Sequence, residues 1–372
     1  MTLFTATIIA PDSSHWGKWL DAAQSPNPER RRRAHTLHGR LLEQGRLPLL
    51  SWHHLEELLG VENDSTARTR IEFLQQLPFV AYLRLPNEKE GLLGSIVQVL
   101  AAEAIAAAEG CGDLIAVRNR ARELLLTIGN GRQAIGEDIR VWEASRPNVQ
   151  SRKGTANMIA TFGPLRTFDE KLTIGELAKL PFNSPDQIRM QLDLSYARAL
   201  REAILSTGGD TIGARKMADE FMTQVLARTP PPGATVREML VLMLVDQGVD
   251  ESEIRDESVL EDLNRLALFR SQLRVVASKT GRSFQELKKV SMDVLPSRVI
   301  SEALKVHGQP RSLRPGSDHI DSHLAVLAAY CTVLYVDKRT AEDFRRARNK
   351  EPRLTGLIGD IAKAGDFEGL LA

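Results

Sequence analysis

Cysteine and aromatic residues are scarce in this sequence, and its opposite charges nearly cancel. Of 372 residues only Cys111 and Cys331 are cysteines, and aromatic residues make up 5%. Two cysteines far apart in sequence exclude the disulfide framework of a small secreted domain, so we expect a reducing, cytoplasmic compartment. The formal net charge of +1 is not that of a strongly basic nucleic-acid-binding domain. Binding to nucleic acid would therefore depend on local groups of basic residues.

Long hydrophobic runs are also lacking. The longest apolar stretch, residues 92–108, is interrupted by Gln98 and Glu103 and is too short to span a membrane. The apolar run near the N-terminus is short and has no basic segment before it, unlike a signal peptide. We therefore expect no membrane partner. With 42% hydrophobic residues, the chain is long enough for a full α/β domain and a helical domain.

Two acidic residues near the C-terminal end belong to segments of different periodicity. Residues 321–330 carry apolar residues at helical spacing, which predicts a helix with Asp321 in its first turn. Residues 332–336 are β-branched and aromatic, which predicts a buried strand that ends just before Asp337. Ligands of open parallel α/β sheets bind outside the carboxyl ends of the strands, so we expect Asp337 at a functional edge.

Two more acidic residues have comparable positions near the N-terminus. Residues 5–10 predict a short strand that is stopped by Pro11 and followed directly by Asp12. Ser51 is expected to cap a helix with Glu57 in its second turn and with an apolar inward face, namely Leu55, Leu58 and Leu59. Glu56 competes with Glu57, and the residues alone leave that choice open. Four acids that converge at one edge would hold a hard divalent cation.

The order of these motifs resembles the PIN-like nuclease family. The matching features are a strand ending in Asp12, Ser51 followed six residues later by Glu57-Leu, the motif Asp321-x-x-Leu-Ala, and a strand ending in Asp337-Lys. The resemblance implies an α/β fold, a Rossmann-like PIN-type α/β/α sandwich with a central parallel sheet. It also implies hydrolysis of phosphodiester bonds with Mg²⁺ or Mn²⁺, in RNA more often than in DNA. It covers under half of the chain, residues 1–85 and 295–350.

The resemblance assigns a role to each of several residues. Asp12, Glu57, Asp321 and Asp337 correspond to the catalytic acids, which hold one or two metal ions that activate a water for in-line attack. Three further residues have supporting roles, in which Asp318 and His323 position that water or lie behind the metal ligands, and Lys338 neutralises the scissile phosphate.

The middle of the chain departs from the small members of that family. About two hundred residues separate the second and third acids, and a compact domain rarely tolerates so long a loop without structure of its own. Amphipathic patterns predict helices, with an exposed link at residues 145–170. We therefore expect a large all-α insertion at residues 91–294, between two parts of the nuclease domain at residues 1–90 and 295–372. The insertion would select substrate, hold the nuclease inactive, or bind a regulatory protein or a second copy of the chain.

Two groups of basic residues flank the predicted acidic site in sequence. They are Arg30, Arg31, Arg32 and Arg33, before Glu57, and Arg345 and Arg346, after Asp337. Such groups can lead a phosphate backbone past carboxylates, although basic runs also form ordinary solvated helix faces.

The sequence thus predicts a cytoplasmic, metal-dependent endonuclease that prefers RNA to DNA, with a toxin or an antiviral, phage-defence effector as its biological role. The alternative is a catalytically inactive PIN-like scaffold that binds RNA or a protein partner. Intact acids argue against the scaffold, because clustered carboxylates repel one another without a cation.

Overall fold

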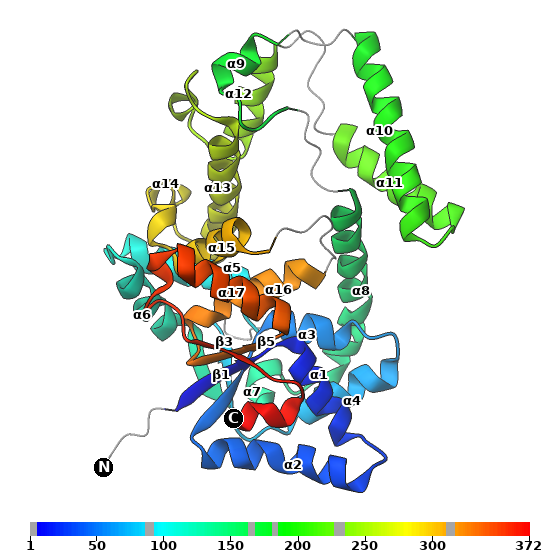
Figure 1. Cartoon of the computed structure of the whole chain (residues 1–372), viewed down its shortest axis with the longest axis vertical. Helices are drawn as coiled ribbons and strands as arrows, with labels where there is room; N and C mark the ends of the chain where they lie inside the picture. The colour runs from blue at the N-terminus through cyan, green and yellow to red at the C-terminus, as the bar shows by residue number, and fades with distance from the viewer. Residues whose placement is uncertain (1–5, 86–92, 163–167, 181–184, 227–234, 310–316) are drawn as a thin grey trace. The chain divides into compact units, whose positions relative to one another are not determined.

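A computed structural model describes residues 6–85, 93–162, 168–180, 185–226, 235–309 and 317–372 of the chain. One part of the chain is built around a six-stranded sheet with the order β4-β3-β2-β1-β5-β6, and Figure 1 labels three of its strands. All neighbouring strands are parallel except β3 and β4, which are antiparallel. The strands are β1 (Thr7–Pro11), β2 (Arg46–Leu50), β3 (Val80–Leu83), β4 (Leu126–Gly129), β5 (Val333–Val336) and β6 (Asp360–Lys363). The expectation of a mixed α/β fold is confirmed, with a sheet that is mostly parallel.

The strands contribute alternate residues to opposite faces of the sheet, as extended backbone requires. Ile9, Tyr82 and Tyr335 belong to the core that is shared with a first group of helices. Ile8 and Leu334, next to them in sequence, are buried on the opposite face. The first group is α1 (Ser13–Ala23), α2 (Pro28–Glu43), α3 (Trp52–Leu59), α4 (Asp64–Gln75), α7 (Gly131–Ile135) and α8 (Ile139–Phe162).

A second group of helices is separate from the first in Figure 1. Its members pack against one another. In this group α5 packs on α6, and α15 packs on α5, α6 and α17. Its members are α5 (Ile96–Ala108), α6 (Leu114–Leu125), α15 (Pro296–His307) and α17 (Lys338–Lys350). The remaining short elements near them are α14 (Phe284–Leu287), α16 (Ser317–Ala325) and 3₁₀ turns at Met292–Val294, Val326–Ala329 and Pro352–Leu354, whereas the 3₁₀ turn at Phe367–Leu371 packs on α1 and α2 of the first group.

The few aromatic side chains are concentrated in the first core. Trp16 and Trp19 are fully buried and stacked, with ring centroids 5.2 Å apart. The indole N–H of Trp19 donates to the carbonyl of Ala34, which ties α1 to α2. Large rings bury much apolar area per residue, so a small number of them can fill this interior.

The chain divides into two compact units, and the boundary differs from the expected insertion at residues 91–294. Residues 91–153 and 276–294 belong to the first unit, and the second unit lies within residues 154–275. Residues 126–129 are β4, so this stretch is not all helical. The strand was missed because its four residues follow α6 with no turn residue between them, and the helical pattern continues into it.

The predicted link at residues 145–170 is also wrong, because residues up to 162 continue α8. The guanidinium of Arg146 is buried and donates to the carbonyls of Leu59, Val61 and Glu62. These contacts fix α8 beside α3 and α4, although Pro147 interrupts its helical hydrogen bonds.

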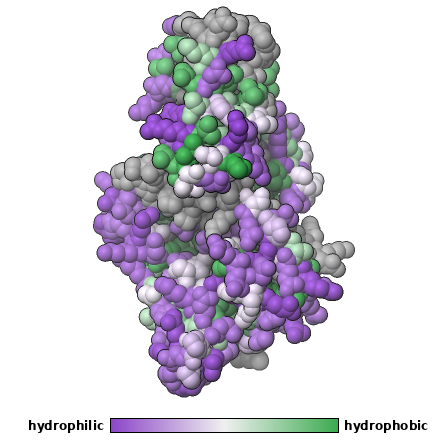
Figure 2. All heavy atoms as spheres, turned by 90° about the vertical axis from the view of Figure 1, so that its right-hand side faces the viewer, coloured by the Kyte–Doolittle hydropathy of each residue, from purple (hydrophilic) through white to green (hydrophobic). Residues whose placement is uncertain are grey.

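The second unit contains two helical groups. One packs Ile174, Leu240 and Leu263 into a common core. Its helices are α9 (Ile174–Ala178), α12 (Val236–Asp246) and the part of α13 (Leu260–Thr280) that precedes Val276, with a 3₁₀ turn at Glu251–Glu253. The other is a hairpin of α10 (Pro185–Ser206) and α11 (Thr211–Leu226), with Ala203 and Ala214 buried inside. Large apolar side chains such as Leu194 are exposed on this hairpin, and Figure 2 shows apolar surface there.

In the part of the chain that the structure describes, no helix combines the length and the apolar character needed to cross a bilayer.

A buried carboxyl group connects α5 with segments far away in sequence. Glu103 is completely buried and accepts hydrogen bonds from the backbone N–H of Ser297 at 2.9 Å and from the hydroxyl of Tyr330 at 2.6 Å. Burial raises the pKa of Glu103 from 4.5 to about 7, although these hydrogen bonds favour its charged form. The first turn of α15 is thereby held by a carboxyl group that is half protonated near neutral pH.

This shift predicts a pH-dependent stability. Between pH 4.5 and about 7 the unfolded chain releases the Glu103 proton while the folded protein keeps it. The free energy of unfolding should therefore fall as pH rises through this window, by roughly 3 kcal/mol in total. Glu103→Gln stays neutral and should remove most of this slope, as measured by urea unfolding at several pH values. The exposed Glu43→Gln is the matched control, and an unchanged slope in Glu103→Gln would contradict the assignment.

Candidate functional site

The carboxyl ends of β1 and β5 meet at the point where the direction of the sheet reverses. From β1 the order runs through β2 to β3 on one side and through β5 to β6 on the other. The two central strands pair in parallel, with Pro11 opposite Tyr335, and the N–H of Asp12 donates to the carbonyl of Tyr335 at 3.0 Å. In open α/β sheets such a switch point is the usual ligand site. Asp12 and Asp337 directly follow these two strands.

β1 extends one residue further than expected, because Pro11 is its last residue and does not lie just outside the strand. Pairing of β1 with β2 extends only to Ile9, so the missing N–H of Pro11 breaks no ladder there.

Asp12 caps α1 and forms an ion pair with a buried histidine. Its Oδ1 accepts from the N–H of His15 at 3.0 Å and from the hydroxyl of Ser14 at 2.7 Å, and lies 2.7 Å from His15 Nδ1. Burial alone would raise the pKa of Asp12, but the hydrogen bonds and charge of His15 outweigh it and lower this pKa. Burial likewise acts against charge on His15, yet Asp12 raises its pKa. Each partner therefore favours the charged form of the other.

Asp337 caps α17 in the same way that Asp12 caps α1. Both residues have φ −67° and ψ 169°, and Asp337 Oδ1 accepts from the N–H of Thr340 at 2.6 Å. Asp337 and Lys338 are exposed, whereas Asp12 is largely buried. Within the described residues, the hydrogen bonds of both carboxylates go to Oδ1. This leaves Oδ2 as the oxygen of each group that a cation would bind.

The helix that carries Glu57 begins and packs as predicted. Ser51 is the N-cap of α3, and Leu55, Leu58 and Leu59 are buried. The capping partner was not predicted: His54 Nδ1 accepts from the N–H of Ser51 at 3.0 Å. Burial and the neighbouring His53 lower the pKa of His54 to about 3, so this ring is neutral. His54 is therefore a structural residue of the helix start.

The two competing acids of α3 differ in their surroundings. Glu56 Oε2 lies 3.4 Å from His53 Nδ1, so Glu56 contacts a residue of its own helix. Glu57 is partly buried and lies four residues after His53, on the same face of the helix.

The third acid lies on a helix that contacts α3. Asp321 is in the second turn of α16, not the first, because the helix begins at Ser317. The ring centroid of His323 lies 4.7 Å from that of His53. The side chain of Asp318 lies outside the described residues.

The four predicted acids therefore lie on, or directly after, two pairs of neighbouring elements. The parallel strands β1 and β5 bring Asp12 and Asp337 to one switch point, and the helices α3 and α16 that carry Glu57 and Asp321 contact each other. Among the described residues, no three His, Cys, Asp or Glu side chains are close enough to form a metal cage. Mg²⁺ does not need such a cage, because it usually binds one or two carboxylates and completes its shell with water and substrate phosphate. The carboxylates at the switch point fit that mode.

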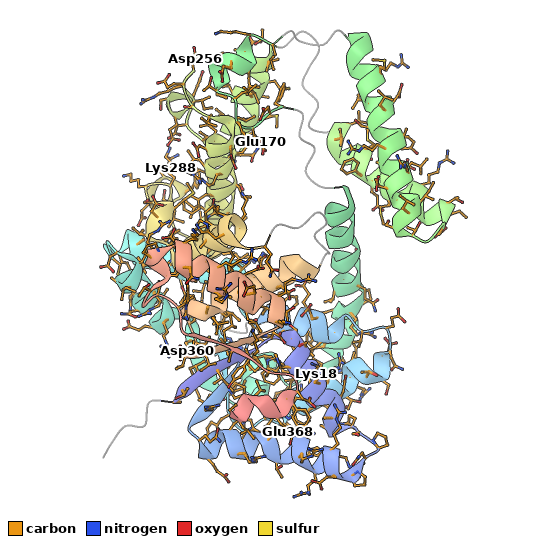
Figure 3. The ribbon with its side chains drawn as sticks, in the orientation of Figure 1. Lys18, Glu170, Asp256, Lys288, Asp360 and Glu368 are labelled. Carbon is orange, nitrogen blue, oxygen red and sulfur yellow. The ribbon has the colours of Figure 1, made fainter. Side chains whose placement is uncertain are left out.

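Both basic groups are largely matched by acidic partners. In α2, Arg32 pairs with Glu29 and Arg33 pairs with Glu368, each at 2.9 Å; Figure 3 shows Glu368 beside α2. Arg30 lies 3.9 Å from Asp366, and Arg31 donates to the carbonyl of Ser25. In α17, Arg345 and Arg346 share Glu342 at 2.6 and 3.1 Å. These pairings reduce the positive charge that either group offers to nucleic acid.

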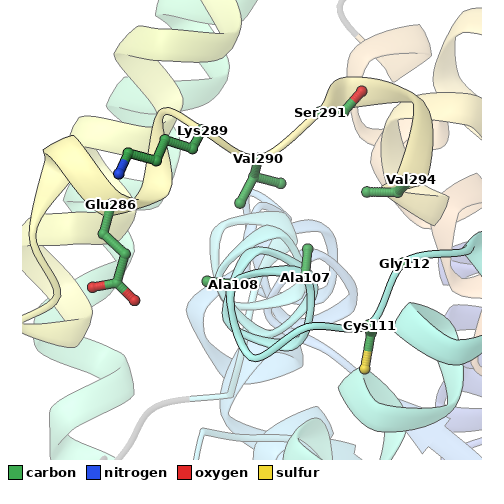
Figure 4. Close-up of a pocket in the computed structure, with 9 residues that line it drawn as sticks. All are labelled: Ala107, Ala108, Cys111, Gly112, Glu286, Lys289, Val290, Ser291 and Val294. Atoms are coloured by element: carbon green, nitrogen blue, oxygen red, sulfur yellow. The ribbon is translucent and has the colours of Figure 1, made fainter.

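A pocket elsewhere contains none of the predicted site residues. It has a volume of about 300 Å³ at the end of α5, with Ala107, Cys111 and Lys289 in its wall (Figure 4). The pocket therefore does not bear on the acidic site.

Comparison with protein-family models, curated proteins and solved structures gave no significant match.

Sequence reasoning missed the histidines around the acids. His15, His53 and His54 are buried within the first turns of α1 and α3, beside residues that had been singled out. A signal was present for one of them, because an acidic N-cap followed three residues later by histidine places both groups on one helical turn.

The pair of Asp12 and His15 predicts a second pH dependence, on the alkaline side. Its contribution is complete between 3.8 and 6.5, the ordinary pKa values of aspartate and histidine, because the pKa of Asp12 is lowered and that of His15 is raised. Stability should therefore fall as pH rises above 6.5 through the folded pKa of His15. His15→Gln keeps a donor for the carbonyl of Ala364 but cannot be charged, so its melting temperature should change less over this range. Exposed His35→Gln is the control, and parallel pH curves for wild type and His15→Gln would refute the pair.

Proposed function

We propose that this chain is a metal-dependent nuclease with a PIN-like, Rossmann-type domain, and that Asp12 and Asp337 bind its metal ion directly. One observation carries the proposal: two carboxylates that end neighbouring central strands flank the topological switch point of an open sheet. Both motifs also match the family resemblance. Ligand sites of α/β proteins occur preferentially at such points.

The arrangement suits phosphodiester hydrolysis. A Mg²⁺ or Mn²⁺ ion held by Asp12 and Asp337 would lower the pKa of a bound water and stabilise charge on the leaving oxygen. The residues of the chain supply the rest: α1 and α17 direct their positive N-terminal ends to the same edge, where they favour a phosphate. Lys338, exposed beside Asp337, adds a positive charge for that phosphate.

Glu57 and Asp321 have a different place in this scheme. They lie on α3 and α16, and we assign them contacts with the ion through water, or with the attacking water itself. His323 and Asp318, on the same helix as Asp321, support that function.

The substrate and the setting follow from the resemblance. We propose RNA before DNA as the substrate, in the cytoplasm, and a toxin or antiviral defence effector as the biological role. The second unit, within residues 154–275, is assigned the selection of substrate or the binding of a regulatory protein or second copy.

One observation favours the non-cutting scaffold. Asp12 and Asp337 each complete a helix cap, and this structural function alone would account for an aspartate at both positions. The two functions differ in what Asn does there, because Asn caps a helix about as well as Asp but carries no charge.

Asp12→Asn and Asp337→Asn should each lower cleavage of labelled single-stranded RNA by at least about 100-fold, with Mn²⁺ present. Their melting temperatures should stay close to that of the wild type because the caps remain. The control is Asp360→Asn. Asp360 is an exposed aspartate at the amino end of β6, whereas Asp12 and Asp337 follow the carboxyl ends of their strands (Figure 3). Cleavage that EDTA does not stop, or that survives in both variants, would refute the metal site.

Mn²⁺ should also stabilise the folded protein, because binding to the native state alone raises the melting temperature. The double variant Asp12→Asn/Asp321→Asn should lose most of this response in a thermal-shift titration, whereas Asp360→Asn should keep it. An equal shift in the double variant and the wild type would mean that the ion binds elsewhere.

A further inference from the structure

His53 is buried, and a hydrogen bond at one of its ring nitrogens holds it in place. Its Nε2 accepts a hydrogen bond from the backbone N–H of Ile96 at 3.3 Å, which is one of the donors left over at the start of α5. Because Nε2 accepts, the ring proton is assigned to Nδ1, which faces Glu56 Oε2 at 3.4 Å. The residue is only 8% exposed. Burial and the hydrogen bond to Ile96 restrict the ring, which therefore makes a rigid surface.

The face of this ring contacts α16. The ring centroids of His53 and His323 are 4.7 Å apart, with an angle of 42° between the ring planes. His323 is two residues after Asp321, and β5 follows soon after α16. The contact therefore joins the helix that carries one candidate acid to the helix that carries another.

The described part of α16 is anchored at its C-terminal end and also contacts α3. It packs against α3, α15 and the 3₁₀ turn at Val326–Ala329. Leu324 and Ala325 anchor its C-terminal end in the interior, whereas Asp321, His323 and the rest of its described N-terminal side are at least partly exposed. The rigid ring of His53 thus supports the helix at the turn that carries Asp321.

We propose that His53 is a positioning residue: its fixed imidazole packs against His323 and thereby sets the position of α16 and of Asp321 at the acidic edge. This inference deepens the proposed function and rests on it for its catalytic consequence. Active-site groups must be held to within about 0.5 Å of their working geometry, and a misplacement of about 1 Å can lower a rate 100-fold.

Two substitutions separate the ring contact from the hydrogen bond to Ile96. His53→Gln places an amide oxygen near the position of Nε2, so it keeps the acceptor and loses the ring. His53→Phe keeps a flat ring against His323 and loses the acceptor. His35→Gln, at an exposed histidine of α2 whose ring lies 6.0 Å from that of Phe73, is the control for loss of an imidazole contact.

The first measurement is amide hydrogen exchange of residues 321–325 in the full chain. His53→Gln should raise exchange there, whereas His53→Phe and His35→Gln should leave it near the wild-type value. Unchanged exchange in His53→Gln would overturn the proposal. Faster exchange in His53→Phe alone would also overturn it, because His53 would then act only through Ile96.

The second measurement is cleavage of labelled RNA with Mn²⁺. His53→Gln should lower kcat roughly 10- to 100-fold with little change in KM, and His53→Phe should recover most of that loss. A rise in KM alone would overturn a positioning role. If the wild type cleaves nothing, the proposed function fails, and hydrogen exchange still decides whether His53 positions α16.

Discussion

The parallel pairing of β1 with β5 is the constraint on which the rest of the site depends. The hydrogen bond from the N–H of Asp12 to the carbonyl of Tyr335 joins segments from near the two ends of the sequence. It fixes the register in which Asp12 and Asp337 leave neighbouring strands, and each then begins a helix. Everything between them in the chain, including the whole second unit, must leave and return without disturbing that pairing.

The acids that follow β1 and β5 cap helices, and their charge also suits them to bind a cation. A carboxylate at a helix N-terminus is stabilised by the free N–H groups of the first turn and by the helix dipole. The protein therefore keeps Asp12 charged although it is largely buried, and His15 strengthens this effect. A preformed negative charge in a partly dehydrated position is what a divalent cation requires of its ligand. The histidines of α3 add rigidity: His54 completes a capping box, and His53 contacts α16.

Local sequence signals predicted the strands and helices around the acids well, but they predicted contacts between segments far apart in sequence poorly. The strand before Asp337 and the cap and buried face of α3 followed from β-branched residues, Ser51 and apolar spacing. The extent of the first unit could not be predicted from such signals, because β4 has only four residues and becomes a strand by pairing with β3. The carbonyls that hold Arg146 likewise come from distant residues, so no local pattern distinguishes α8 from a link. The contact between His53 and His323 exists only after α3 and α16 have packed.

The central claim is that Asp12 and Asp337 form one metal site, and a calorimetric double-mutant cycle with Mn²⁺ tests it most directly. Asp12→Asn and Asp337→Asn should each weaken Mn²⁺ binding by about tenfold or more. The double variant should lose clearly less affinity than the sum of the two single losses, because residues that share a ligand are coupled. Independent, additive losses, or a wild-type affinity that survives in both single variants, would contradict a shared site at the ends of β1 and β5.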